Sequence, residues 1–168
     1  MKTQKIDTAT RDKLFSANTE IVLATVESLR EKGNKEYLPM LFDILISAPE
    51  AEVQVAILKL LGTVKDKETI PVFIDVLQNE KYKSIRKEIT TTCWQNGLDF
   101  SLHMGIFVDL VITESWEVAF EAFTVIENLE HFPPEEEHKA IQLKIAGALK
   151  TADEKKQYFL EEILRMPS

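Results

Sequence analysis

The sequence predicts an all-α protein built as a superhelix of stacked helix pairs, and three observations support this prediction. Similar segments recur about 32 residues apart along the chain. Within each segment, apolar residues return every three or four positions, which is the period of an amphipathic helix. The chain also holds only 5 glycines and 6 prolines in 168 residues, too few for a β protein with many tight turns.

The recurrence is clearest in three short segments that carry an aspartate in the same slot. These segments are "LPMLFDIL" at 38–45, "IPVFIDVL" at 70–77 and "MGIFVDLV" at 104–111. The aspartates are Asp43, Asp75 and Asp109, so the second spacing is two residues longer than the first. We expect the extra residues to lie in a turn. A single helix pair cannot bury its apolar stripe alone, so the pairs must stack.

The expected elements follow one another in a simple order. A short capping helix comes first, four helix pairs follow, and a closing helix ends the array. We place the capping helix at 8–16, the pairs at 18–49, 50–81, 82–114 and 115–150, and the closing helix at 153–166.

The pair at 50–81 shows the pattern of each unit most completely. Its core positions are Val53, Ala56, Ile57, Leu60, Leu61 and Val64 in the first helix, and Ile70, Phe73, Ile74 and Leu77 in the second. Asp66 is suited to cap a helix. Pro71 suits a first turn, where the missing N–H is not needed. In the preceding pair, Gly33 can end one helix and Asn34 can start the next.

The register of the last segment stays open. Residues 134–150 can be the second helix of the fourth pair, followed by the closing helix at 153–166. Alternatively, 134–166 can form an additional pair, because "KIAGALK" at 144–150 resembles "KLLGTVK" at 59–65. We prefer the first interpretation because it keeps first and second helices in alternation.

The repeated unit resembles HEAT repeats, and in particular the short HEAT-like units of phycobilisome lyases within the armadillo-like superfamily. The segment "VQVAILKLLGTVKDKETIPVFIDVL" at 53–77 follows that pattern, with Gly62 in the glycine slot. The segment "SIRKEI" at 84–89 keeps the Val-Arg-like start of the pattern as Ile85 and Arg86. Trp94 departs from it by replacing the glycine of the third unit. The resemblance implies a right-handed superhelix whose second helices line a concave face. It does not imply one function, because such scaffolds serve many.

The positions of the second helices that the core does not use form an acid-and-apolar strip. The strip residues are Met40, Asp43, Val72, Asp75, Ile106 and Asp109, with His103 nearby. A surface of this kind suits a basic amphipathic peptide. The alternative is that the aspartates only keep an outer face solvated, as outward acids do on many helices.

Other reactive residues do not form a recognisable site. Glu88 and Glu121 occupy matching positions on adjacent first helices, and we interpret them as two solvated glutamates. His131 and His138 flank "FPPEEE", at a spacing that suits zinc poorly. Cys93 falls in a core column without a basic neighbour, which predicts an inert buried thiol. We therefore predict no catalytic residue, metal or cofactor.

The composition limits the kinds of partner that the protein is expected to bind and the cell compartment in which it is expected. The net charge is −8 and the chain has only four arginines, which disfavours nucleic acid and anionic membranes as partners. A single cysteine permits no internal disulfide. The N-terminal residues lack the apolar core of a signal peptide, and no apolar run approaches a membrane span. A cytoplasmic location is expected.

These features predict a non-catalytic interaction scaffold that binds a protein or peptide on its concave face. The resemblance leaves two enzymatic alternatives, a chaperone for tetrapyrrole attachment and a DNA glycosylase-like protein. The second needs a basic groove, whereas the available groove residues are acidic. A purely structural, self-associating domain is a further alternative. Trp94 and Trp116, near helix ends, are expected to pack between units, although they could anchor a partner.

Overall fold

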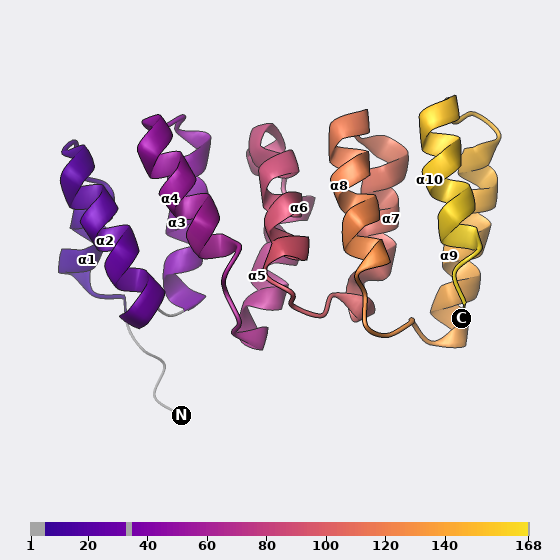
Figure 1. Cartoon of the computed structure of the whole chain (residues 1–168), viewed down its shortest axis with the longest axis horizontal. Helices are drawn as coiled ribbons and strands as arrows, with labels where there is room; N and C mark the ends of the chain where they lie inside the picture. The colour runs from indigo at the N-terminus through magenta and orange to yellow at the C-terminus, as the bar shows by residue number, and fades with distance from the viewer. Residues whose placement is uncertain (1–5, 33–34, 168) are drawn as a thin grey trace.

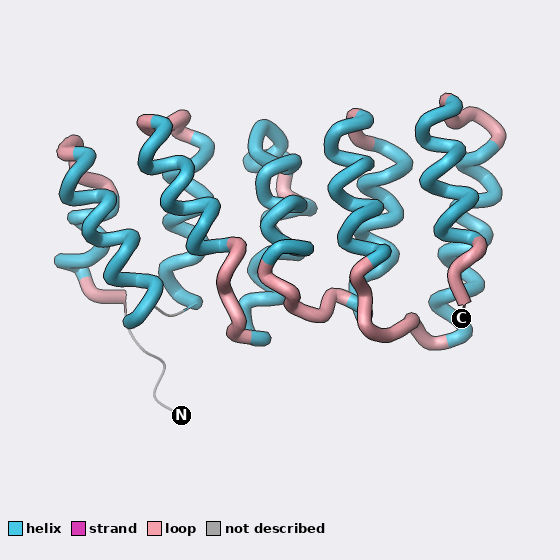
Figure 2. Tube along the Cα trace, viewed as in Figure 1, coloured by secondary structure: helices cyan, strands magenta, loops and turns pink. Residues whose placement is uncertain are grey.

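A computed structural model describes residues 6–32 and 35–167 of the chain. The predicted turn at Gly33 and Asn34 lies outside the described residues. Over the described ranges the secondary structure is helical, without a strand (Figure 2). The α-helices are α1 (Thr8–Leu14), α2 (Thr19–Lys32), α3 (Leu38–Ile46), α4 (Ala51–Leu61), α5 (Ile70–Gln78), α6 (Arg86–Gln95), α7 (Met104–Thr113), α8 (Trp116–Glu127), α9 (Glu135–Leu149) and α10 (Glu154–Leu164).

The helices stand side by side in two rows, as Figure 1 shows. One row, here called the A helices, contains α2, α4, α6, α8 and α10. The other row, the B helices, contains α3, α5, α7 and α9, while α1 packs beside α2 at the start of the array. Each A helix packs against the next A helix, so the apolar core runs continuously through the layer between the rows. The predicted all-α solenoid of stacked helix pairs is confirmed.

A short 3₁₀ turn directly precedes each of the first three B helices, so the same local structure recurs in each unit. They are η1 (Lys35–Tyr37), η2 (Lys67–Thr69) and η4 (Ser101–His103). Asp66 caps η2, because its side chain accepts a hydrogen bond from the N–H of Glu68 at 2.9 Å. Pro39 and Pro71 occupy the first turns of α3 and α5. The capping aspartate and the helix-start proline predicted for the second unit are confirmed.

A chain of buried phenylalanines runs along the inner side of the B helices. Phe42, Phe73, Phe100 and Phe107 are fully buried. Their ring centroids lie 5.7, 6.2 and 5.5 Å apart in succession, and each pair meets edge to face. Phe100 belongs to the turn between α6 and α7, residues 96–103, which is as long as its counterpart between α4 and α5, residues 62–69. The repeat is lengthened instead in the link between α5 and α6, where residues 79–85 stand in place of the shorter link 47–50 between α3 and α4. The turn with Phe100 is not only a surface loop, because it fills the core between α5 and α7 with an aromatic ring.

The C-terminal end of the array continues both rows. α9 packs beside α7, and α10 packs beside α8. The ammonium group of Lys156 on α10 donates to the backbone carbonyls of Ile112 and Glu114, at the end of α7. Because these carbonyls lack helical partners, the lysine caps α7 and ties α10 to the B helices. None of the described helices is both long and apolar enough to cross a membrane.

Two glycines should respond in opposite ways to alanine. Gly147 lies inside α9, and a Cβ atom added there meets no atom within 4 Å. We expect Gly147→Ala to raise the free energy of unfolding by about 0.5–1 kcal/mol, because alanine loses less backbone entropy in a helix. Gly97 has a φ of +72°, a conformation that alanine adopts only with strain, so Gly97→Ala should lower the free energy of unfolding by about 1 kcal/mol. Urea unfolding monitored by circular dichroism measures both, and destabilisation by Gly147→Ala would contradict the prediction.

Candidate interaction surface

The predicted strip residues all lie on the B helices or at their starts. Met40 and Asp43 lie on α3, Val72 and Asp75 on α5, and Ile106 and Asp109 on α7, with His103 immediately before α7. Asp75 and Asp109 are exposed, and Asp43 is half-buried. The apolar strip residues differ from the expectation of an exposed ladder. They are half-buried and pack against the core, because neighbouring elements cover their flanks.

Asp43 is already held by the segment that links the second unit to the third. The hydroxyl of Tyr82 donates to its Oδ1 at 2.6 Å, and the ammonium group of Lys81 lies 2.9 Å from the same oxygen. The hydrogen bond to Asp43 and its negative charge raise the pKa of Lys81. Burial, followed by the hydrogen bond to Asp43, raises the pKa of Tyr82. This carboxylate therefore fastens η3 (Glu80–Ile85) to α3.

Asp109 is also paired, in this case with the next B helix. The Nζ atom of Lys144 on α9 lies 2.7 Å from Oδ1 of Asp109 on α7. Both side chains are substantially exposed, so the pair contributes little stability. These two partner lysines were not predicted from the sequence. Their position along the repeat is the feature that could have indicated them, because Lys81 and Lys144 each lie one unit beyond the aspartate that they contact.

Asp75 differs from the other two aspartates. Its side chain is exposed, and within the described ranges it has neither an ion pair nor a hydrogen bond. Val72 lies one turn before it on α5. The strip thus contains two carboxylates that bind ammonium groups of the chain and one carboxylate that is open to a cation from outside.

The sequence predicted that Glu88 and Glu121, on the A helices, are two solvated glutamates, and this prediction is wrong. Oε2 of Glu121 accepts a hydrogen bond from the indole N–H of Trp94 at 2.6 Å. Oε2 of Glu88 is buried and has no hydrogen-bond partner among the described residues. Both side chains are half-buried because neighbouring A helices pack closely on either side. Glu121 is thus engaged by Trp94, and no hydrogen bond joins the two glutamates among the described residues.

The histidines and the cysteine are separated in the fold. Nδ1 of His131 lies 3.0 Å from Asp99, and with Glu130 these residues bring potential metal-ligating atoms within 4.8 Å of one another. Partial burial would raise the pKa of Asp99, but hydrogen bonds from Ser101 and His131 outweigh it and lower that pKa. His138 is buried elsewhere, at the start of α9. The Asp99 carboxylate already serves to join two neighbouring turns.

Cys93 lies in the core. Its side chain is almost completely buried, and burial raises the pKa of the thiol strongly. A thiol that stays protonated is a poor nucleophile and a poor metal ligand. The predicted location of Cys93 in a core column is confirmed.

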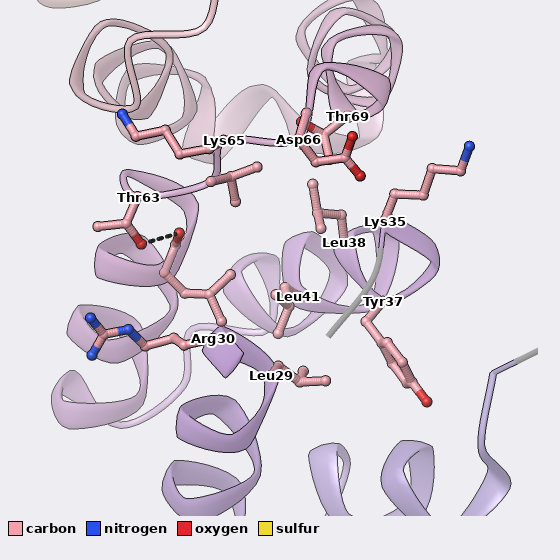
Figure 3. Close-up of a pocket in the computed structure, with 12 residues that line it drawn as sticks. Leu29, Arg30, Lys35, Tyr37, Leu38, Leu41, Thr63, Lys65, Asp66 and Thr69 are labelled. Atoms are coloured by element: carbon pink, nitrogen blue, oxygen red, sulfur yellow. Dashed lines mark hydrogen bonds between the residues drawn. The ribbon is translucent and has the colours of Figure 1, made fainter. Parts of the chain in front are cut away.

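A cavity of about 330 Å³ lies between the first two units, and Figure 3 shows its lining. Its apolar wall consists of Leu29, Leu38, Leu41, Leu60 and Val64. The charged ends of Arg30, Lys35 and Lys65 point away from the centre (Figure 3). Lys35 pairs with Glu68 at 2.9 Å, and Lys65 donates to the carbonyl of Asn96 at 2.5 Å. The cavity offers apolar surface without a convergent set of reactive groups.

Two rows of helices with a continuous core between them define the class of this protein, an α-solenoid of stacked helix pairs. Residues 10–92 match the family model for HEAT repeats. Together with the stacked helix pairs, this match supports a HEAT-like repeat family for the chain. The match does not single out the phycobilisome-lyase type of unit within that family. None of the curated proteins compared with the chain matches it.

Proposed function

We propose that this protein is a non-catalytic interaction module whose B helices bind a basic segment of a protein or peptide. HEAT repeats commonly serve as protein-interaction scaffolds. The observation that supports the proposal most directly is the difference among the three strip aspartates. Asp43 and Asp109 bind lysine ammonium groups at 2.9 and 2.7 Å, whereas Asp75 presents the same carboxylate to solvent.

The surroundings of Asp75 favour an amphipathic partner over a free cation. Val72 precedes it by one turn, and Ile106 and His103 belong to the next B-helix unit. These half-buried side chains offer apolar contact area beside the charge. A lysine or arginine of the partner would pair with Asp75, while apolar side chains of the same segment would contact Val72 and Ile106.

The test is a titration of the isotope-labelled full chain with a helical peptide made of leucine and lysine, followed by amide NMR shifts. We expect shifts to concentrate on α5 and the start of α7. Asp75→Lys should weaken binding by about tenfold, because it replaces attraction with repulsion. Reversal of Asp43 or Asp109 is less informative, because either change would also break an internal ion pair.

Glu127→Lys is the matched control, because it makes the same change of charge at an exposed position of an A helix. It should leave the affinity within about twofold of the unmodified chain. Equal binding by the unmodified chain and the Asp75→Lys variant would show that the strip is not the binding surface. Equal weakening by both variants would show a general effect of net charge.

A further inference from the structure

A second surface lies on the A helices and is rich in exposed aromatic rings. Its members are Trp94 on α6, Trp116 and Phe120 on α8, and Tyr158 on α10, here called the aromatic face. Between 36% and 60% of each side chain is exposed. Large aromatic side chains gathered in this way are typical of sites that bind other proteins.

The rings of the aromatic face are held in place by contacts within the chain. The indole N–H of Trp94 is fixed by Glu121 at 2.6 Å, which joins α6 to α8. The rings of Trp116 and Phe120 stack with centroids 5.6 Å apart, and both lie within 6.4 Å of the buried ring of Phe159 on α10. Because these contacts already order the rings, a partner would not have to do so on binding.

The charges around these rings favour a cation as the bound group. The ammonium group of Lys155 lies 5.0 Å from the ring centroid of Trp116, so the chain itself places a cation over this surface. Glu117 is exposed on α8, three residues before Phe120 and therefore on the same side of the helix. Glu121 adds a second carboxylate beside Trp94.

Aromatic rings combined with carboxylates are the groups that recognise arginine. A guanidinium group can stack flat on a ring and donate to a carboxylate at the same time, whereas an ammonium group stacks less well. We propose that the aromatic face binds an arginine-bearing basic segment of a partner protein. This surface lies on the A helices and is separate from the strip around Asp75 on the B helices.

The chain offers a direct readout, because Trp94 and Trp116 are its two tryptophans. Their fluorescence therefore reports on the aromatic face. We expect hexa-arginine, added to the full chain at low salt, to cause a saturable change in emission, and hexa-lysine to bind more weakly. Phe120→Ser and Glu117→Gln should each weaken the binding of hexa-arginine by about fivefold. Glu117→Gln alters an exposed side chain, so the test stands even if Phe120→Ser disturbs folding.

Matched variants separate this site from general attraction to an acidic protein. Lys155→Ala should tighten binding because it removes the competing cation, whereas Lys150→Ala, with the same change of net charge, should not. Glu136→Gln on α9 and Asp75→Lys on α5, both exposed positions of the other row, should bind hexa-arginine as the unmodified chain does. Normal affinity of Glu117→Gln, or equal weakening by Glu136→Gln, would overturn the proposal. A change of tryptophan emission with protein concentration in the absence of peptide would also overturn it, because the aromatic face would then be a self-association surface.

Discussion

We expect Leu61→Asp to abolish the cooperative unfolding of this protein. Leu61 lies on α4 and is completely buried in the core between the rows. Loss of a buried leucine alone costs about 2–5 kcal/mol. The aspartate would in addition bring a charge into apolar surroundings without a partner, which costs several kcal/mol more. Together these terms approach the roughly 5–15 kcal/mol of stability that a folded domain possesses.

The measurement is thermal and urea unfolding followed by circular dichroism, with Val55→Asp as the control. Val55 lies on the same helix, six residues before Leu61, and 65% of it is exposed. Its replacement by aspartate should change the free energy of unfolding by no more than about 0.5 kcal/mol. A Leu61→Asp protein that kept a sharp transition at the original midpoint would contradict the assignment of Leu61 to the core.

The architecture could be predicted from the sequence because every repeat carries the same helical spacing of apolar residues. A stripe such as Val53, Ile57 and Leu61 can be buried only by stacking, and the turn signals at Asp66 and Pro71 fix where each helix begins. Phe100 was not predicted to enter the core, because it belongs to no helical stripe. Its burial depends on the distance between α5 and α7, which is a property of the assembled array.

The candidate surface could be predicted only in part, for a related reason. Helical periodicity places Asp43, Asp75 and Asp109 on outward positions, but it does not report what lies opposite them. Lys81 and Lys144 reach the first and last of these from other elements, and only the folded array brings them within ion-pair distance. For the same reason, Asp75 could not be distinguished from its two counterparts before the structure was known.

The second large effect is expected at Arg86, the first residue of α6. Its side chain is only 4% exposed, and its guanidinium group lies 2.5 Å from Glu114, which is itself largely buried at the end of α7. The same group donates to the backbone carbonyl of Asn79, at the end of α5. One buried arginine thus connects the ends of two consecutive B helices with the start of an A helix.

Arg86→Met should lower the free energy of unfolding by about 3–5 kcal/mol, since it leaves the Glu114 carboxylate buried without its cation. Methionine keeps much of the apolar length, so the loss reports mainly on the charge. The double variant Arg86→Met with Glu114→Leu should regain most of this loss, because no orphaned charge remains. Urea unfolding of the single and double variants gives the coupling energy. Additive effects of the two substitutions would show that Arg86 and Glu114 do not act as a unit. The contact between α6 and the ends of α5 and α7 would then be stabilised by apolar packing alone.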